Sequence, residues 1–134
     1  MNSFSLTIVT PDGVQFEGLA EALTVRTTTG DLGILAGHIN CVAPLGMGLA
    51  SITAEGQKRY AACMGGVVSV LAGQVKLVPT TFEWADQIDL ARAKLSEQRA
   101  KDIIADKSST DTDLRLAEAR LKRALIRQRV TEYK

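Results

Sequence analysis

The first half of the chain alternates between hydrophobic and polar residues with the period of a β-strand. Phe4, Leu6 and Ile8 are separated by single polar residues, which is typical of a strand with one buried face. The segment 10–13, Thr-Pro-Asp-Gly, predicts a turn, because proline presets one dihedral angle and glycine accepts a positive φ. Short strands and turns at this spacing predict an antiparallel sandwich or barrel. Further strands are expected at residues 14–17, 23–28, 67–71 and 75–78, the last two as a hairpin around Gly73.

The second half has the pattern of amphipathic helices. Residues 86–107 contain no Gly or Pro, and Ile88, Ala91 and Leu95 follow helical spacing on one face. Residues 108–112 are rich in side chains that cap helices rather than continue them, so the helix is expected to break there.

A second helix is expected over residues 113–132, and the short break before it predicts an antiparallel hairpin. Alanine is frequent where the two helices are expected to face each other, which lets them approach closely. Alanine also buries little apolar area, so the hairpin gains little from packing and is expected to open or relocate easily. The apolar stripe on one face of the second helix is expected to consist of Leu114, Ala117, Leu121, Ala124 and Leu125.

Composition separates the two halves at the same point. The chain has 134 residues, and all eleven glycines lie between Gly13 and Gly73. We therefore predict an all-β sandwich domain of about ten strands at residues 1–84, followed by an α-helical hairpin at residues 85–134. No export signal is visible at the N-terminus, so the two cysteines, at positions 41 and 63, are expected to be free, buried thiols.

Charge is unevenly distributed along the chain. The formal net charge is +1, but residues 114–134 carry seven basic and two acidic side chains, a local charge of +5. A basic helix on a slightly acidic protein favours an acidic partner or an anionic ligand. The near-neutral total and the 4% aromatic content argue against nucleic-acid binding.

The glycine-rich segment 30–38 contains the single histidine, His38. No serine or threonine is placed to form a catalytic triad with it, so a structural or interface role is favoured. The glycines match neither a dinucleotide-binding fingerprint nor a P-loop, and one histidine with two distant cysteines does not make a zinc site.

Four arginines on the two expected helices are the sharpest chemical signal. Arg92 and Arg99 are seven residues apart, Arg123 and Arg127 are four apart, and Asp89 lies three before Arg92. A closed hairpin could bring them together as a phosphate-binding cluster. Solvent-exposed helix faces with salt bridges between neighbouring side chains explain the same spacing. Spacing alone therefore leaves both interpretations open, a phosphate-binding cluster and exposed salt bridges.

Several motifs in one order make the chain resemble the epsilon subunits of bacterial F-type ATP synthases over essentially its whole length. The marks are Val9-Thr10-Pro11-Asp12-Gly13, Gly30-x-x-Gly33-Ile34-Leu35-x-Gly37-His38, Met64-Gly65-Gly66-Val67, Ile88-Asp89-Leu90-Ala91-Arg92-Ala93 and Leu121-Lys122-Arg123-Ala124.

The resemblance implies a ten-stranded β-sandwich followed by two helices, in a subunit that is not catalytic. Such subunits form the central rotor stalk with the gamma subunit and join it to the membrane ring of c subunits. The loop that matches the family's ring-facing loop makes Asp31 and His38 the candidates for contacts with the c ring and gamma. The expected location is the cytoplasmic face of the bacterial membrane, peripheral and held through the complex.

The resemblance also implies a regulatory hairpin. In this family the hairpin is permissive when folded on the sandwich, and it inhibits ATP hydrolysis when extended into the catalytic head of alpha and beta subunits. Some members bind regulatory ATP, with or without magnesium, and no other cofactor is implied. The residues that match that nucleotide site are Glu83, Ile88, Asp89, Arg92, Ala93, Arg99, Arg123 and Arg127.

Three other classes of protein are alternatives to this family. A nucleic-acid-binding module would use the basic helix and bind in a steeply salt-dependent way. A free-standing sandwich that dimerises through its helices would need longer apolar heptads than this stripe provides. A hydrolase would need a nucleophile–base pair, which the sequence does not show.

Overall fold

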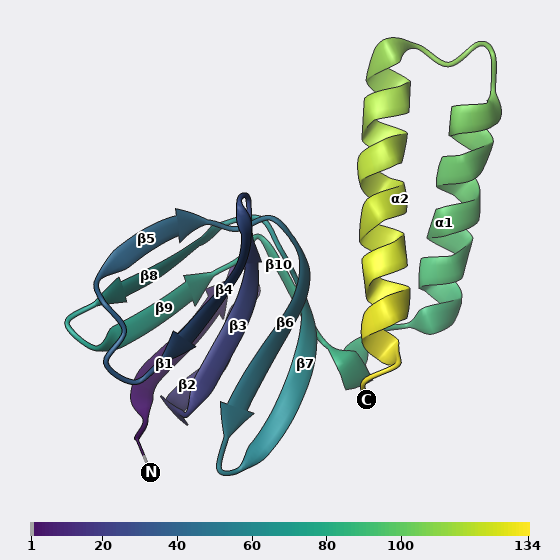
Figure 1. Ribbon diagram of the computed structural model, residues 1–134. Helices are drawn as coiled ribbons and strands as arrows, with labels where there is room; N and C mark the ends of the chain where they lie inside the picture. Colours follow the sequence, from purple (N-terminus) through teal and green to yellow (C-terminus); the bar gives the residue numbers. More distant parts are fainter. Residues whose placement is uncertain (1) are drawn as a thin grey trace.

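The computed structural model describes residues 2–134, which form two five-stranded sheets and a pair of helices standing beside them (Figure 1). The predicted sandwich followed by a hairpin is confirmed. The strands are β1 (Phe4–Thr10), β2 (Gly13–Ala20), β3 (Ala22–Thr27), β4 (Gly30–Leu35), β5 (Cys41–Pro44), β6 (Met47–Ala54), β7 (Gln57–Met64), β8 (Val67–Leu71), β9 (Gln74–Val78) and β10 (Thr81–Trp84).

The strands are ordered β2-β1-β9-β8-β5 in the first sheet and β10-β7-β6-β3-β4 in the second. All neighbours are antiparallel except β1 and β9, which run parallel with Ser5 opposite Gln74 and Ile8 opposite Leu77. The expectation of a purely antiparallel sandwich is therefore wrong at this one pair. These two strands lie far apart in the chain, so no tight turn forces them to run in opposite directions.

The core lies between the two sheets and follows the alternation seen in the sequence. Phe4, Leu6 and Ile8 are 6, 0 and 0% exposed, and Leu77 on the parallel neighbour is also fully buried. Replacing a buried Leu or Ile with Ala typically costs about 2–5 kcal/mol of stability. Packing within the sandwich therefore holds this domain together without help from the helices.

The helical segment begins later than its composition suggested. A short 3-10 helix, η1 (Ala85–Gln87), comes first, and α1 covers Leu90–Ala105 rather than 86–107. Asp89 ends the extended segment, and its carboxylate accepts a hydrogen bond from the backbone N–H of Arg92 at 3.0 Å. An aspartate that caps in this way fixes the start of a helix at the next residue.

The second helix, α2, covers Asp111–Thr131, close to the predicted 113–132. Thr110 caps it, with Asp113 completing a reciprocal capping box. Residues 106–110 form the break, slightly earlier than the predicted 108–112. The hairpin prediction is confirmed, and the end of the hairpin opposite its base points away from the sandwich (Figure 1).

As predicted, alanines form the buried interface between the two helices, which we call the seam. Some of the side chains that were expected on it are exposed. The stripe proposed for the first helix is wrong, because Ala91 is exposed and Leu95 is 52% exposed. Ile88 is buried, but it lies in extended backbone before the cap, so helical spacing cannot be counted from it. On α2, Leu125 is 46% exposed, whereas its neighbours on the seam are buried. The buried seam residues are Ala93, Ala100, Ala117 and Ala124, at 4, 0, 2 and 0% exposure.

One polar link reinforces the seam between the helices. The Gln128 amide donates to the Glu97 carboxylate at 2.7 Å, and Lys101 pairs with the same carboxylate at 2.6 Å. The Lys101 ammonium and the Gln128 amide together hold the pKa of Glu97 below its ordinary value. The Glu97 side chain is 20% exposed and that of Lys101 54%, so solvent screens the ion pair more than the hydrogen bond from Gln128.

The hairpin attaches to the sandwich only near its base. A small apolar cluster joins Ile88 and Val130 to strands β6 and β7 of the second sheet. The rest of both helices stands clear of the sheets (Figure 1). The members of this cluster, which we call the junction cluster, are Ala62, Met64, Ala85, Ile88 and Val130, with Met47, Leu49, Tyr60 and Ile126 partly buried against it.

Both cysteines are free, as expected, but only one is fully buried. Cys63 is 2% exposed, and burial raises the pKa of its thiol to about 12. Cys41, at the start of β5, is half-buried, so the prediction of two buried thiols is wrong for this residue.

Candidate functional site

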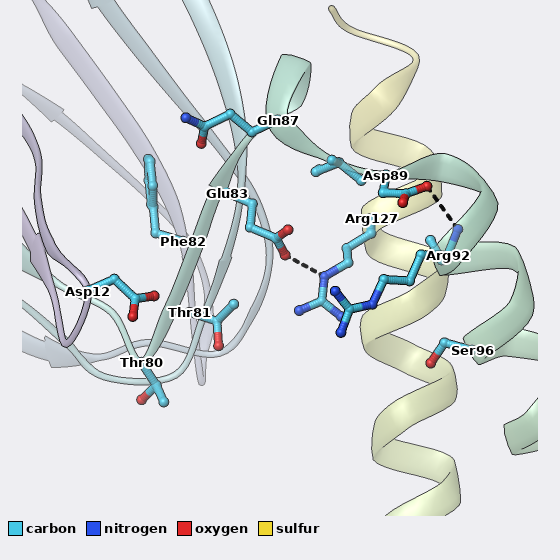
Figure 2. Close-up of a pocket in the computed structure, with 12 residues that line it drawn as sticks. Asp12, Thr80, Thr81, Phe82, Glu83, Gln87, Asp89, Arg92, Ser96 and Arg127 are labelled. Atoms are coloured by element: carbon cyan, nitrogen blue, oxygen red, sulfur yellow. Dashed lines mark hydrogen bonds and ion pairs between the residues drawn. The ribbon is translucent and has the colours of Figure 1, made fainter.

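A pocket of about 480 Å³ lies between the end of the sandwich and the base of the hairpin (Figure 2). Its walls come from the β1–β2 turn, the segment that leads through β10 into η1, the first turns of α1, and the last turns of α2. The lining residues are Asp12, Thr80, Thr81, Phe82, Glu83, Gln87, Ile88, Asp89, Arg92, Ala93, Ser96 and Arg127.

An ion pair closes one side of this pocket. Glu83 on β10 accepts a hydrogen bond from Nε of Arg127 on α2 at 2.5 Å, although 44 residues separate them in the chain. The side chains are 33 and 27% exposed, so water screens the pair only partly. The pair spans the sandwich and the hairpin, so the position of Arg127 depends on the hairpin being folded down.

The start of α1 forms another part of the wall. The Asp89 carboxylate caps the helix, which places Arg92 in the first turn with its side chain projecting into the pocket (Figure 2). Ala93 and Ile88 are only 4 and 5% exposed and supply an apolar surface beside these charges. A guanidinium presents several N–H donors in one plane, so Arg92 and Arg127 together can bind an anion such as a phosphate.

The pocket includes six of the eight residues predicted for a nucleotide site. The six are Glu83, Ile88, Asp89, Arg92, Ala93 and Arg127.

The folded hairpin does not bring all four arginines together. Arg99 is exposed on α1, two helical turns beyond Arg92, and does not line the pocket. Arg123 is half-buried one turn before Arg127, about 6 Å along the axis of α2, and does not line it either. The geometry thus supports a site with two arginines.

The sequence did not reveal several polar residues of the pocket. Thr80, Thr81, Gln87 and Ser96 belong to segments without a recognisable motif. Asp12 was recognised as part of a turn, but its position opposite α1 depends on how the sandwich and the hairpin pack.

The predicted interface residues lie elsewhere, on β4 and the segment that follows it. Asp31 pairs with Arg26 at 3.4 Å, with side chains 66 and 52% exposed, so this ion pair contributes little stability. His38 is half-buried, and its Nδ1 lies 2.8 Å from the carbonyl oxygen of Ile39 and 4.0 Å from Sγ of Cys41.

Three exposed apolar side chains lie within four residues of His38 in the chain, and a fourth lies at the end of β8. The Asn40 side chain accepts a hydrogen bond from the backbone N–H of Ala72 at 2.9 Å, which ties this segment to the β8–β9 turn. Exposed apolar side chains gathered in this way are typical of a protein interface. We call this surface the loop patch, and its residues are Leu35, Ile39, Val42 and Leu71, at 63, 78, 74 and 67% exposure.

Two further observations concern the described residues 2–134. No helix among them is long and apolar enough to cross a membrane. No group of three or more His, Cys, Asp or Glu side chains among them is arranged to hold a metal ion.

Comparison with known proteins gives matches over both parts of the chain. Residues 3–85 match the family model described as "ATP synthase, Delta/Epsilon chain, beta-sandwich domain", and residues 86–132 match "ATP synthase, Delta/Epsilon chain, long alpha-helix domain". An ATP synthase epsilon chain from Bacillus velezensis is 42% identical over 127 residues, covering 95% of this chain and 96% of that one. One from Ruminococcus albus is 41% identical over 136 residues, covering 100% of each.

Two solved structures share the fold. A chain from the mitochondrial ATP synthase OSCP/F1/c-ring structure of Euglena gracilis superposes with a TM-score of 0.80 at 24% identity, covering 91% of this chain and 77% of that one. A chain from the central stalk/c-ring structure of the Tetrahymena thermophila mitochondrial ATP synthase gives a TM-score of 0.62 at 16% identity, covering 95% of each. The resemblance inferred from the motifs is confirmed, and the chain belongs to the ATP synthase delta/epsilon chain family.

Proposed function

We propose that this chain is a rotor subunit of an F-type ATP synthase, which joins the gamma subunit to the c ring and performs no catalysis itself. The observation that carries the proposal is the match to ATP synthase epsilon chains over nearly the full length of the chain. In this role it would lie at the cytoplasmic face of the membrane as a peripheral subunit, held there by its partners.

The loop patch supplies the surface for those partners. Its four apolar side chains lie beside His38, within and around the segment matched to the ring-facing loop, and Asp31 lies on the adjacent strand β4. Burying exposed apolar side chains against gamma or the ring is favourable, at about 25 cal/mol per Å² of apolar area. A protein surface of this kind suits a permanent contact under torque better than a transient one.

Binding to the isolated gamma subunit tests the interface. Val42→Asp introduces a charge on β5, one edge of the first sheet, and should weaken binding at least tenfold in calorimetry. Leu19→Asp is the matched control, because Leu19 is 65% exposed on β2 at the opposite edge of the same sheet. Equal binding by both variants and the unmodified chain would contradict this assignment.

The hairpin is the proposed regulatory element. Its seam is alanine-rich and its attachment is confined to the base, so leaving the folded position breaks few contacts. The +5 charge of residues 114–134 suits an acidic surface on the catalytic beta subunits. The folded hairpin would permit ATP hydrolysis, and the extended hairpin would inhibit it by entering the alpha/beta head.

ATP is the proposed ligand of the junction pocket. Arg92 and Arg127 would hold the phosphates, and Glu83 and Asp89 offer acceptors for the amino and hydroxyl groups of a nucleoside. Arg92 belongs to α1, Arg127 to α2 and Glu83 to β10, so the site is complete only when the hairpin is folded. ATP would therefore stabilise the folded state by its preferential affinity for it. Calorimetric titration with and without magnesium tests this proposal.

A further inference from the structure

The C-terminal end of α2 packs against the sandwich. Val130 is 0% exposed in the junction cluster, and Thr131 is 9% exposed. Just beyond the helix, the ring of Tyr133 lies against that of Tyr60 on β7, with centroids 4.5 Å apart and planes inclined by 33°. The last five residues thus combine a buried aliphatic contact with an aromatic one.

Aromatic residues are concentrated at this junction. The chain has six in all, and four of them are Tyr60, Phe82, Trp84 and Tyr133. Phe82 meets Trp84 edge to face at 4.9 Å, and Arg59 lies 3.7 Å above the Trp84 ring. Lys58 lies 5.6 Å from the ring centre of Tyr60. Tyr60, Trp84 and Tyr133 line one hollow, so the contacts of Lys58 with Tyr60 and of Arg59 with Trp84 help to order the surface that Tyr133 meets.

The remainder of the hairpin has little hold on the sandwich. Within residues 2–134, the ion pair of Arg127 with Glu83 is the one side-chain hydrogen bond that joins α1 or α2 to a strand. Leu95 and Leu116 are 52 and 64% exposed on the helices. Attachment thus depends on the junction cluster, one partly screened ion pair, and the Tyr133 contact.

We propose that Val130 and Tyr133 form a latch that holds the hairpin in its folded position independently of any nucleotide. Val130 fills the junction cluster, and Tyr133, which is 42% exposed, stacks on Tyr60 at the edge of that cluster. The inference rests on the proposed movement of the hairpin. Its test uses no nucleotide, so the latch can fail while ATP binding stands, and the reverse also holds.

The structure sets the expected size of the effect. An aromatic pair contributes enough beyond its area to shift an equilibrium roughly 2- to 12-fold. Tyr133→Ala should therefore raise the population of detached hairpin by about this factor. Tyr133→Phe keeps the ring and should change it less than about twofold, because the hydroxyl has no hydrogen bond among the described residues. Val130→Ala should act in the same direction as Tyr133→Ala, because it leaves a gap in a fully buried position.

Amide hydrogen exchange of the full chain, read by NMR without nucleotide, tests the latch. In Tyr133→Ala, exchange of amides 126–131 should accelerate about 2- to 12-fold, while amides of β1 keep their rates and show that the sandwich is intact. Leu116→Ala is the control, because it removes an exposed leucine from the same helix away from the sandwich. Acceleration confined to residues 132–134, or no greater than in Leu116→Ala, would overturn the proposal.

Discussion

The sharpest test of the junction pocket is the replacement of Arg127 by alanine. This arginine lines the pocket from α2, and its guanidinium already pairs with Glu83 on β10. If it also binds a phosphate, the substitution removes a charge-assisted hydrogen bond worth about 1.5–3 kcal/mol. That loss corresponds to a roughly 10- to 150-fold weaker affinity for ATP.

The substitution has a second consequence that must be separated from the first. Without its partner, the half-buried Glu83 carboxylate faces the pocket as an uncompensated negative charge and repels an anion. The double variant Glu83→Gln/Arg127→Ala removes this repulsion, so it should recover part of the lost affinity. A double-mutant cycle with Glu83→Gln gives the coupling between the two residues.

Isothermal titration calorimetry of the full chain with ATP, with and without magnesium, measures these affinities. Arg92→Ala should behave like Arg127→Ala, because both side chains line the pocket. Arg99→Ala is the matched control, since Arg99 is exposed two turns further along α1, and its effect should be less than about threefold. An unchanged ATP affinity of Arg127→Ala, or an equal loss of affinity in Arg99→Ala, would contradict a phosphate site at Arg92 and Arg127.

Three further predictions follow from the packing. Ala100→Leu should lower the free energy of unfolding of the hairpin by about 1–3 kcal/mol, because the 0% exposed seam has no room for a larger side chain; helical circular dichroism during heating measures it. Gly66→Ala should destabilise the sandwich by at least about 1 kcal/mol in urea titrations, because Gly66 has φ +88° and a Cβ there would overlap the carbonyl oxygen of Val78; wild-type stability would contradict this. A thiol reagent at pH 8 should modify Cys41 before Cys63, because Cys63 is buried. Burial raises the pKa of native Cys63 from 9.0 to about 12, so Cys63 loses its proton at lower pH in the unfolded chain than in the folded one. The free energy of unfolding should therefore fall as pH rises from 9 to 12, and it should fall more in the unmodified chain than in Cys63→Ala.

Sequence patterning predicted the fold well where local signals agree. The alternation at Phe4, Leu6 and Ile8, the turn that begins at Thr10, and the hairpin around Gly73 are each determined by neighbouring residues, and the structure has all three. The parallel pairing of β1 with β9 could not be predicted, because it joins segments almost seventy residues apart with no turn between them.

The errors in the first helix have one physical origin. Residues typical of helices begin at position 86, so composition predicts a helix that starts there. In the structure, Asp89 caps the helix and leaves Ile88 in extended backbone. Counting the stripe from Ile88 therefore placed Leu95 on the buried face, where the structure has Ala93 and Ala100. A capping residue determines the phase of a helix, and composition alone does not reveal it.

The site was predictable in its residue types and only partly in its geometry. Spacing on one helix relates Asp89 to Arg92, and the structure places both at the pocket. The contact between Glu83 and Arg127 depends on how the hairpin packs against β10, which no local pattern encodes. The same packing leaves Arg99 outside the pocket.

The proposed pocket is complete only in the folded hairpin and would couple ATP to the position of the helices. Amide hydrogen exchange of the full chain during a titration with ATP tests this coupling. Added ATP should slow exchange together in the first turn of α1 and in residues 126–131 of α2, because the ligand bridges the two helices and β10. Saturable ATP binding that leaves both helical segments unprotected would contradict it, as would the absence of any protection at millimolar ATP.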